Sequence, residues 1–330
     1  MSSDENGFKP VMIGVVGDSA TGKTTLTQGI QQLLGPERVT VICIDDYHKY
    51  DRVQRKELDI TPLHPEANYM DIMAQHLRLL RQGKSILKPV YNHSRGSFDA
   101  PVYVKPTEYV IIEGLLAFYN KEMRDVFDVR IFLDPAEDLR RRWKVTRDTN
   151  KRGYTPEQVI ADLEKREPDS AAFIRPQRAY ADTIVRFYAD PVPQETDSHL
   201  NVKLTMTGDL QHPDFSKVVT RPDGANGVRL SNGRESGRVA EFVEIAGSIS
   251  TTKALKLEHY ILEELKLTGH DPERELGLFT AGRETGRSHP LALTQLFLAY
   301  HLLRARRVEQ RSAVTKYNHI EITKELISFF

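Results

Sequence analysis

Hydrophobic residues in the first half of the chain form short continuous runs separated by amphipathic stretches. Four of these runs are typical of strands buried on both faces of a sheet: 11–16, 39–44, 109–112 and 129–133. Between or after them, apolar residues recur at helical spacing over three segments: 24–34, 69–80 and 135–150. Thr155 followed by Pro156 and Gln158 predicts the start of one more helix. Because strands alternate with helices, the pattern predicts a mostly parallel α/β sheet covered by helices on both faces.

The pattern changes near Asp190. Residues 199–206 alternate between apolar and polar positions, which predicts a half-exposed strand. Five glycines follow between Gly208 and Arg238, and the pairs Asn226-Gly227 and Asn232-Gly233 are hairpin-turn signals. Helical spacing returns over two segments, 254–267 and 291–304. We therefore expect a core at 1–190 and an antiparallel and helical extension at 191–330 that is part of the same domain.

Composition narrows the class of protein. Lys and Arg total 46 and Asp and Glu total 46, so the net charge is 0 and the whole molecule has no attraction for nucleic acid or anionic lipid. The single cysteine, Cys43, excludes an internal disulfide and fits a reducing compartment. No apolar run has the length of a membrane helix, and the acidic start Met1–Asn6 is unlike a targeting signal. We expect a cytoplasmic protein with neither a nucleic-acid nor a membrane partner.

A phosphate-binding loop lies between the first predicted strand and the first predicted helix. Gly17–Thr24 fits G-x-x-x-x-G-K-[ST], a pattern that also occurs by chance, but here the required strand and helix flank it. The pattern predicts that Lys23 lies between the β- and γ-phosphates of a nucleoside triphosphate and that the Thr24 hydroxyl ligates Mg²⁺. The residues expected to bind nucleotide are Gly17, Asp18, Ser19, Ala20, Thr21, Gly22, Lys23, Thr24 and Thr25.

Acidic residues follow two of the predicted strands, at the sheet edge where open α/β folds bind ligands. Asp45 and Asp46 follow the strand at 39–44, and a carboxylate there has the chemistry to accept a proton from an attacking hydroxyl. His48 and Arg52 have the chemistry to hold an anionic acceptor. Glu113 stands where an acidic residue orders Mg²⁺ in P-loop proteins. The alternatives are an acidic turn that caps the strand at Asp45 and a solvated loop residue at Glu113.

Charged residues repeat at three- and four-residue steps along the predicted helix at 135–150 and its end. Lys144, Arg147, Asp148, Lys151 and Arg152 therefore share one face, which is suited to fold over phosphates as a lid. The alternative is a solvated basic helix, which is our interpretation of Arg140–Arg142 just upstream. We interpret Trp143 as a packing residue.

Together these motifs resemble the phosphoribulokinase and uridine kinase family, and within it the phosphoribulokinases. The matching pieces cover roughly the first 190 residues in the family's order. They are Gly17–Thr24, Asp45-Asp46-Tyr47-His48 with Arg52, Tyr91-Asn92-His93, Ile112-Glu113-Gly114-Leu115, and Lys144-x-x-Arg147-Asp148 followed by Arg152. The resemblance implies a P-loop kinase that transfers the γ-phosphoryl group of ATP to the C1 hydroxyl of ribulose 5-phosphate.

The resemblance also implies a role for each matching residue. Asp45 would be the catalytic base, and Thr24 and Glu113 would serve Mg²⁺. The residues that would bind the sugar phosphate are His48, Arg52, Tyr91, His93 and Arg152. Lys23 would act on the phosphates, and Lys144, Arg147 and Asp148 would stabilise the transfer. A homodimer is expected from the resemblance alone.

The chain departs from plant-type relatives in one respect that bears on regulation. Those relatives are inhibited through a disulfide between a phosphate-loop cysteine and a cysteine two residues before the base. Here Cys43 keeps the second position, but Thr21 occupies the first. We expect no disulfide-dependent inhibitory partner complex. Two alternatives stay open: a related kinase for another acceptor such as uridine or a different sugar phosphate, and a non-catalytic nucleotide-binding regulatory protein.

Overall fold

The computed structural model describes residues 8–189, 199–207, 227–267, 269–281 and 284–304. Its centre is one sheet of eight strands in the order β2-β5-β1-β6-β7-β8-β10-β9. The first five strands in this order run parallel, and each later neighbour pairs antiparallel. Their bounds are β1 (Val11–Gly17), β2 (Val39–Cys43), β5 (Tyr109–Gly114), β6 (Val129–Leu133), β7 (Thr183–Tyr188), β8 (Asn201–Met206), β9 (Val228–Glu235) and β10 (Arg238–Ile245). The predicted fold, a mostly parallel sheet with an antiparallel extension, is confirmed.

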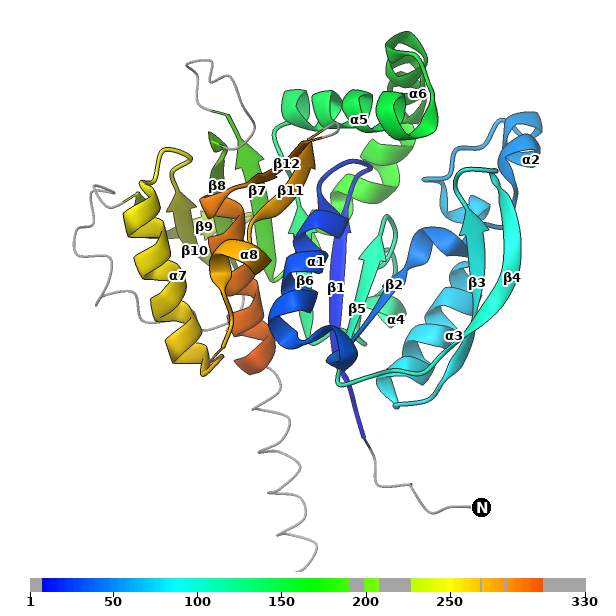
Figure 1. Cartoon of the computed structure of the whole chain (residues 1–330). Helices are drawn as coiled ribbons and strands as arrows, with labels where there is room; N and C mark the ends of the chain where they lie inside the picture. Colours follow the sequence, from blue (N-terminus) through cyan, green and yellow to red (C-terminus); the bar gives the residue numbers. More distant parts are fainter. Residues whose placement is uncertain (1–7, 190–198, 208–226, 268, 282–283, 305–330) are drawn as a thin grey trace, which may run out of the picture.

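Helices cover both faces of the sheet (Figure 1). They are α1 (Lys23–Leu34), α2 (Arg52–Glu57), α3 (Met70–Arg81), α4 (Lys121–Arg124), α5 (Glu137–Arg152), α6 (Pro156–Asp169), α7 (Thr251–Leu265), α8 (Pro272–Glu275) and a helix over 289–304. One core joins alternate residues of β1 to α1, α7 and the helix at 289–304. The other joins the intervening residues of β1 to α3 and α4. All of β1 is buried, because both of its faces are covered.

Two hairpins lie outside the main sheet, β3 (Ile86–Asn92) with β4 (Ser97–Val104) and β11 (Leu278–Ala281) with β12 (Glu284–Arg287). The predicted strand pattern did not include them, nor β7. Pro89 and Pro101 interrupt the apolar runs of β3 and β4, and proline is typical of edge strands and bulges. The pairing register shifts between Lys88 and Val90, on either side of Pro89.

The predicted turn at Asn232-Gly233 is wrong. Both residues lie inside β9, where Asn232 pairs with Glu241 and Gly233 with Ala240. The β9–β10 turn is Ser236-Gly237, whose φ angles of 49° and 81° are both positive, as this kind of two-residue hairpin turn requires. Asn226, in the other predicted turn pair, lies outside the described residues. The predicted helix start is confirmed, because the Thr155 hydroxyl accepts a hydrogen bond from the Gln158 N–H (3.3 Å).

The carboxyl ends of the parallel strands all meet at one edge of the sheet. Figure 1 shows α5 and α6 lying over this edge, where β1 leads into α1. The 3-10 helix Ile44–Tyr47 continues β2 at the same edge, and α2 lies beyond it beside the β3–β4 hairpin. Candidate residues that are up to 135 positions apart in the sequence, Gly17 and Arg152, are therefore brought to one side of the molecule.

Candidate active site

The phosphate loop connects β1 to α1 and requires glycine at two positions. Gly22 has a φ of 89°, a left-handed conformation that strains other residues, and a Cβ on Gly17 would lie 2.6 Å from the Leu133 carbonyl oxygen. The Lys23 Nζ donates hydrogen bonds to the carbonyl oxygens of Gly17 (2.8 Å) and Asp18 (2.9 Å). The curled backbone, the start of α1 and this ammonium group together form a cationic cradle for phosphate.

Glu113 ends β5 next to this loop. The Thr24 hydroxyl donates to Glu113 Oε1 (3.1 Å) and the Thr27 hydroxyl to Oε2 (3.0 Å). Burial raises the pKa of Glu113, although the charge of Lys23 and the two hydroxyls oppose the shift. A hydroxyl beside a carboxylate at a phosphate loop is a donor set suited to Mg²⁺, which completes its shell with phosphate oxygens and water. Thr27 was not predicted, although it lies one helical turn after Thr24.

Helix α5 reaches the loop through two arginines. Arg140 donates to the Ser19 carbonyl oxygen (3.2 Å), lies 3.6 Å from the Asp18 carboxylate, and also pairs with Glu137 (2.7 Å). Arg147 donates to the Ser19 hydroxyl (3.2 Å). The interpretation of Arg140 as a solvated residue is wrong, since its side chain is only 7% exposed. Arg141 and Arg142 follow it directly, so the sequence carries no signal that sets Arg140 apart from them.

Helix α5 puts the predicted charged residues on one face, as their spacing predicts, and part of that face is buried. Lys144 is 1% exposed and pairs with Asp148 (2.7 Å) and, on α6, with Asp162 (3.6 Å). Asp148 also accepts a hydrogen bond from Arg147 (2.8 Å) and lies 3.5 Å from Arg152. Burial opposes the charge of Asp148, but Arg147 and Lys144 outweigh it and lower the pKa to about 2. Lys151 is exposed at the helix end, and Trp143 packs on the core as expected.

The two adjacent carboxylates after β2 have different surroundings. Asp46 pairs with Lys88 and accepts the Tyr91 N–H (3.0 Å), both on β3. In the part of the chain that the structure describes, no donor makes a hydrogen bond to the Asp45 carboxylate. Its Oδ1 lies 3.0 Å from the position that a Cβ on Gly114 would occupy, directly after Glu113. Asp45 is therefore an unpaired carboxylate beside the Glu113–Thr24 pair.

The residues predicted to bind the acceptor form what we call the acceptor side, and three of them, His48, Tyr91 and His93, have rings that pack together. The His48 and Tyr91 rings are 4.8 Å apart, the Tyr91 and His93 rings 5.1 Å, and His48 Nδ1 lies 2.7 Å from Asn68 Oδ1. Burial, with the charge of Arg55, lowers the pKa of His48 to about 4, although Asp45 opposes the shift. Burial also lowers the pKa of His93. Both imidazoles are therefore neutral near pH 7 and add no positive charge for an anionic acceptor.

Arginines supply the positive charge on this side. Arg52 donates to the His93 carbonyl oxygen (2.5 Å) and packs against Gly96 in the β3–β4 turn. Arg55 donates to the Tyr91 hydroxyl (2.6 Å), and the charge of Arg152 contributes to the lowered pKa of His93. Arg55 was not predicted; its only signal was a position one turn after Arg52 on α2.

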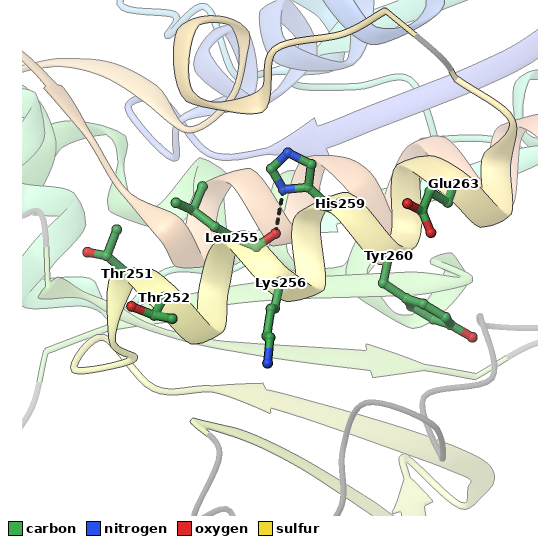
Figure 2. Close-up of a pocket in the computed structure, with 7 residues that line it drawn as sticks. All are labelled: Thr251, Thr252, Leu255, Lys256, His259, Tyr260 and Glu263. Carbon is green, nitrogen blue, oxygen red and sulfur yellow. Dashed lines mark hydrogen bonds between the residues drawn. The ribbon is translucent and has the colours of Figure 1, made fainter.

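Other features lie away from these residues. Figure 2 shows residues of one helix, α7, that line a pocket, among them His259, Tyr260 and Glu263. The volume of this pocket is about 430 Å³. In the described ranges, no group of three or more His, Cys, Asp and Glu side chains is placed to hold a metal ion. No helix there is long and apolar enough to cross a membrane.

The fold and the phosphate loop define a P-loop α/β protein. Among solved structures, the chain is similar to phosphoribulokinase from Rhodobacter spheroides, with a TM-score of 0.55, 18% identity, and coverage of 78% of this chain and 97% of that one. At this identity the likeness shows the fold. The chain belongs to the Phosphoribulokinase / Uridine kinase family, whose model matches residues 12–191.

Curated relatives come from both branches of the family. A phosphoribulokinase of Synechocystis is 41% identical over 190 residues, which cover 58% of this chain and 57% of that protein. A chloroplastic phosphoribulokinase of Mesembryanthemum crystallinum is 34% identical over 244 residues, 68% of this chain and 61% of that protein. A uridine kinase of Staphylococcus aureus is 35% identical over 178 residues, 53% of this chain and 86% of that protein. The matches thus span about 60% of the length of the two phosphoribulokinases.

Proposed function

We propose that this chain is an ATP-dependent kinase that phosphorylates the C1 hydroxyl of ribulose 5-phosphate, giving ribulose 1,5-bisphosphate and ADP. The observation that carries the proposal is the Asp45 carboxylate, which has no hydrogen-bond donor among the described residues and lies beside Gly114, directly after Glu113. The names of the Synechocystis and Mesembryanthemum relatives support this acceptor. We also propose that residues 1–190 form the kinase core and that residues 191–330 belong to the same domain.

In this mechanism Asp45 accepts the proton of the attacking hydroxyl, which is the work of a general base. Lys23 binds the β- and γ-phosphate oxygens. Thr24 and Glu113 would hold Mg²⁺, which when bound would supply positive charge beside the phosphates. Arg147 stabilises the same charge from α5, while the buried pair Lys144–Asp148 holds the Arg147 guanidinium in place.

The acceptor phosphate is bound by guanidinium groups rather than by imidazolium. Arg52 and Arg152 are the charged partners, and Arg55 adds positive potential from behind the Tyr91 hydroxyl. The neutral rings of His48, Tyr91 and His93 form a wall that has hydrogen-bonding capacity for sugar hydroxyls.

The alternative acceptor, uridine, is favoured by the Staphylococcus relative, 86% of which is matched. Uridine carries no phosphate, so it leaves the arginines without an anionic partner. A regulatory protein without turnover is the other alternative, and the presence of Asp45, Lys23 and Arg147 together opposes it. The homodimer and a cytoplasmic location stay predictions.

The test is ADP release with Mg²⁺-ATP and either ribulose 5-phosphate, uridine or no acceptor. We expect release to depend on ribulose 5-phosphate and to be at least about tenfold slower with uridine, the change expected for losing one charged hydrogen bond. Faster release with uridine would show that the acceptor is wrong. Nucleotide binding without release for any acceptor would support the regulatory alternative.

A further inference from the structure

Two consecutive residues at the end of α6 contact both sides of the candidate site. Asp169, the last residue of α6, accepts a hydrogen bond from the Thr61 hydroxyl (2.6 Å). Ser170, the next residue, donates its hydroxyl to the carboxylate of Asp18 in the phosphate loop. The side chains of successive helical residues point about 100° apart, so Asp169 and Ser170 can contact two different parts of the site. None of the family motifs includes Thr61, Asp169 or Ser170.

In the phosphate loop, the carboxylate of Asp18 contacts three residues. Its Oδ1 accepts the Ser19 N–H (2.6 Å) and lies 3.6 Å from Arg140, while its Oδ2 receives the Ser170 hydroxyl. Arg140 in turn donates to the Ser19 carbonyl oxygen (3.2 Å). The conformation of the loop at Asp18 and Ser19 is thus held by α5 and by the turn after α6 together.

On the acceptor side, Thr61 begins a packed segment. Its hydroxyl also accepts the Leu63 N–H (3.1 Å), and Leu63 is buried in one cluster with Ile174, from the turn after α6. The His64 ring packs against the Phe173 ring of the same turn at 4.7 Å.

The same segment supports one wall of the acceptor site. Asn68 donates to the carbonyl oxygens of Pro62 (3.1 Å) and His64 (2.9 Å), and its own amide oxygen contacts His48 Nδ1 (2.7 Å). A continuous set of contacts therefore leads from Asp18 through Ser170, Asp169 and Thr61 to His48.

The segment after α6 has an unusual helical form. Ser170–Ile174 forms a π-helix, and Pro168 precedes it. This form is rare in proteins overall, but where it occurs it is frequently at a functional site. Ser170 is 2% exposed and Thr61 8%, so each hydroxyl that loses its partner is left poorly solvated.

We propose that Asp169 and Ser170 are positioning residues that couple the phosphate loop to the acceptor segment 61–68, so that nucleotide on the loop orders the acceptor side. The identity of the acceptor rests on the proposed function, whereas the coupling needs only nucleotide binding at the loop. Coupling of this kind is typically worth a 5- to 150-fold change in affinity.

The test is amide hydrogen exchange in peptides covering residues 61–69, with and without Mg²⁺ and a non-hydrolysable ATP analogue at saturation. In the unaltered chain we expect the nucleotide to slow exchange about fivefold or more. Ser170→Ala and Asp169→Ala should each abolish this slowing. Asp169→Asn, whose amide oxygen still accepts from Thr61, should retain most of it.

Thr149→Val is the matched control. It removes a hydroxyl of α5 that bonds only within its own helix, to Val145 (2.8 Å) and Thr146 (3.2 Å), and should leave the slowing unchanged. The dissociation constant of the analogue and the melting temperature are measured for each variant, so that lost binding or lost folding is recognised.

Four outcomes separate this proposal from the proposed function. Equal slowing in the alanine variants and the unaltered chain overturns the coupling, as does the absence of slowing in the unaltered chain. Loss of slowing in the alanine variants with retention in Asp169→Asn supports it. If that pattern is found and ribulose 5-phosphate is not phosphorylated, the assignment of the acceptor fails while the coupling stands.

Discussion

The two halves of the candidate site differ in how they are built and in how their polar groups are paired. The phosphate side comes largely from one contiguous loop, and Lys23, Asp18 and Ser19 already have protein partners there. The acceptor side is assembled from separate segments, among them the end of β2, α2 and the β3–β4 hairpin. Its central carboxylate, Asp45, has no hydrogen-bond donor among the described residues.

This difference fits the different roles that we propose for the two halves. A loop whose groups are held in advance binds phosphate with little reorganisation, which is the requirement for electrostatic stabilisation of a transfer. An unpaired carboxylate beside neutral rings keeps its lone pairs available for a proton from a substrate. The adjacent carboxylates Asp45 and Asp46 differ in the same way. Asp46 is paired with Lys88 and with the Tyr91 N–H, whereas Asp45 has no donor among the described residues.

The largest effect is expected at Asp45. Asp45→Asn should lower kcat by about 10²- to 10⁴-fold, the contribution of a general base, with nucleotide affinity nearly unchanged. Asp46→Asn should instead reduce the free energy of unfolding, because Lys88 loses its charged partner. Steady-state kinetics and chemical denaturation of both variants measure the contrast. A folded Asp45→Asn protein with normal turnover would remove Asp45 from the mechanism.

The next effect tests where the acceptor phosphate binds. Arg52→Ala should raise the KM for ribulose 5-phosphate about tenfold or more, because a charged hydrogen bond to that substrate is lost, and should leave the KM for ATP nearly unchanged. Arg95→Ala is the control, since Arg95 is an exposed arginine of the β3–β4 turn, which Arg52 contacts, and it pairs with Asp99. Equal changes in both KM values would indicate a general defect rather than a binding role.

A pH series of stability measurements tests whether the buried imidazole of His48 is neutral in the folded chain. The pKa of His48 is about 4 in the folded chain and near 6.5 when unfolded, so the unfolded state takes up the proton first as the pH falls. Stability should therefore decline between about pH 6.5 and pH 4, with roughly 3 kcal/mol as the upper bound for this group.

Urea denaturation at intervals across this range measures the slope, and His48→Gln should flatten it. The lowered pKa of Asp148, about 2, places its own contribution below pH 4, outside this window. An identical slope in the two proteins would show that His48 is not the group responsible.

The smallest effect is expected at Cys43. The thiol is half-buried, and burial together with Asp45 and Glu113 raises its pKa well above the usual value, so little thiolate forms. The sequence has no second cysteine with which it can pair. Activity should be unchanged by dithiothreitol and by mild disulfide oxidants in paired assays. A large loss that dithiothreitol reverses would show pairing between chains or with a small thiol.

Sequence reasoning succeeded where the chemistry is local. The buried strands, the phosphate loop with its flanking elements, the Thr155 helix start and the spacing of charges on α5 all depend on neighbours along the chain. It failed where the outcome depended on contacts from elsewhere. In the sequence, Arg140 looks like the two arginines that follow it, and only its contact with the phosphate loop distinguishes it. Likewise, only the hydrogen bond to the Tyr91 hydroxyl distinguishes Arg55.

By itself, the sequence determined the class of fold, the nucleotide loop and the order of the acidic and basic motifs, because periodicity and contiguous motifs reflect covalent neighbours. The tertiary structure alone decided which of two adjacent aspartates is left unpaired, that His48 is neutral, and that Thr61 and Ser170 bond to neighbouring positions at the end of α6. These properties depend on burial and on charges from distant segments, and both arise only when the chain has folded.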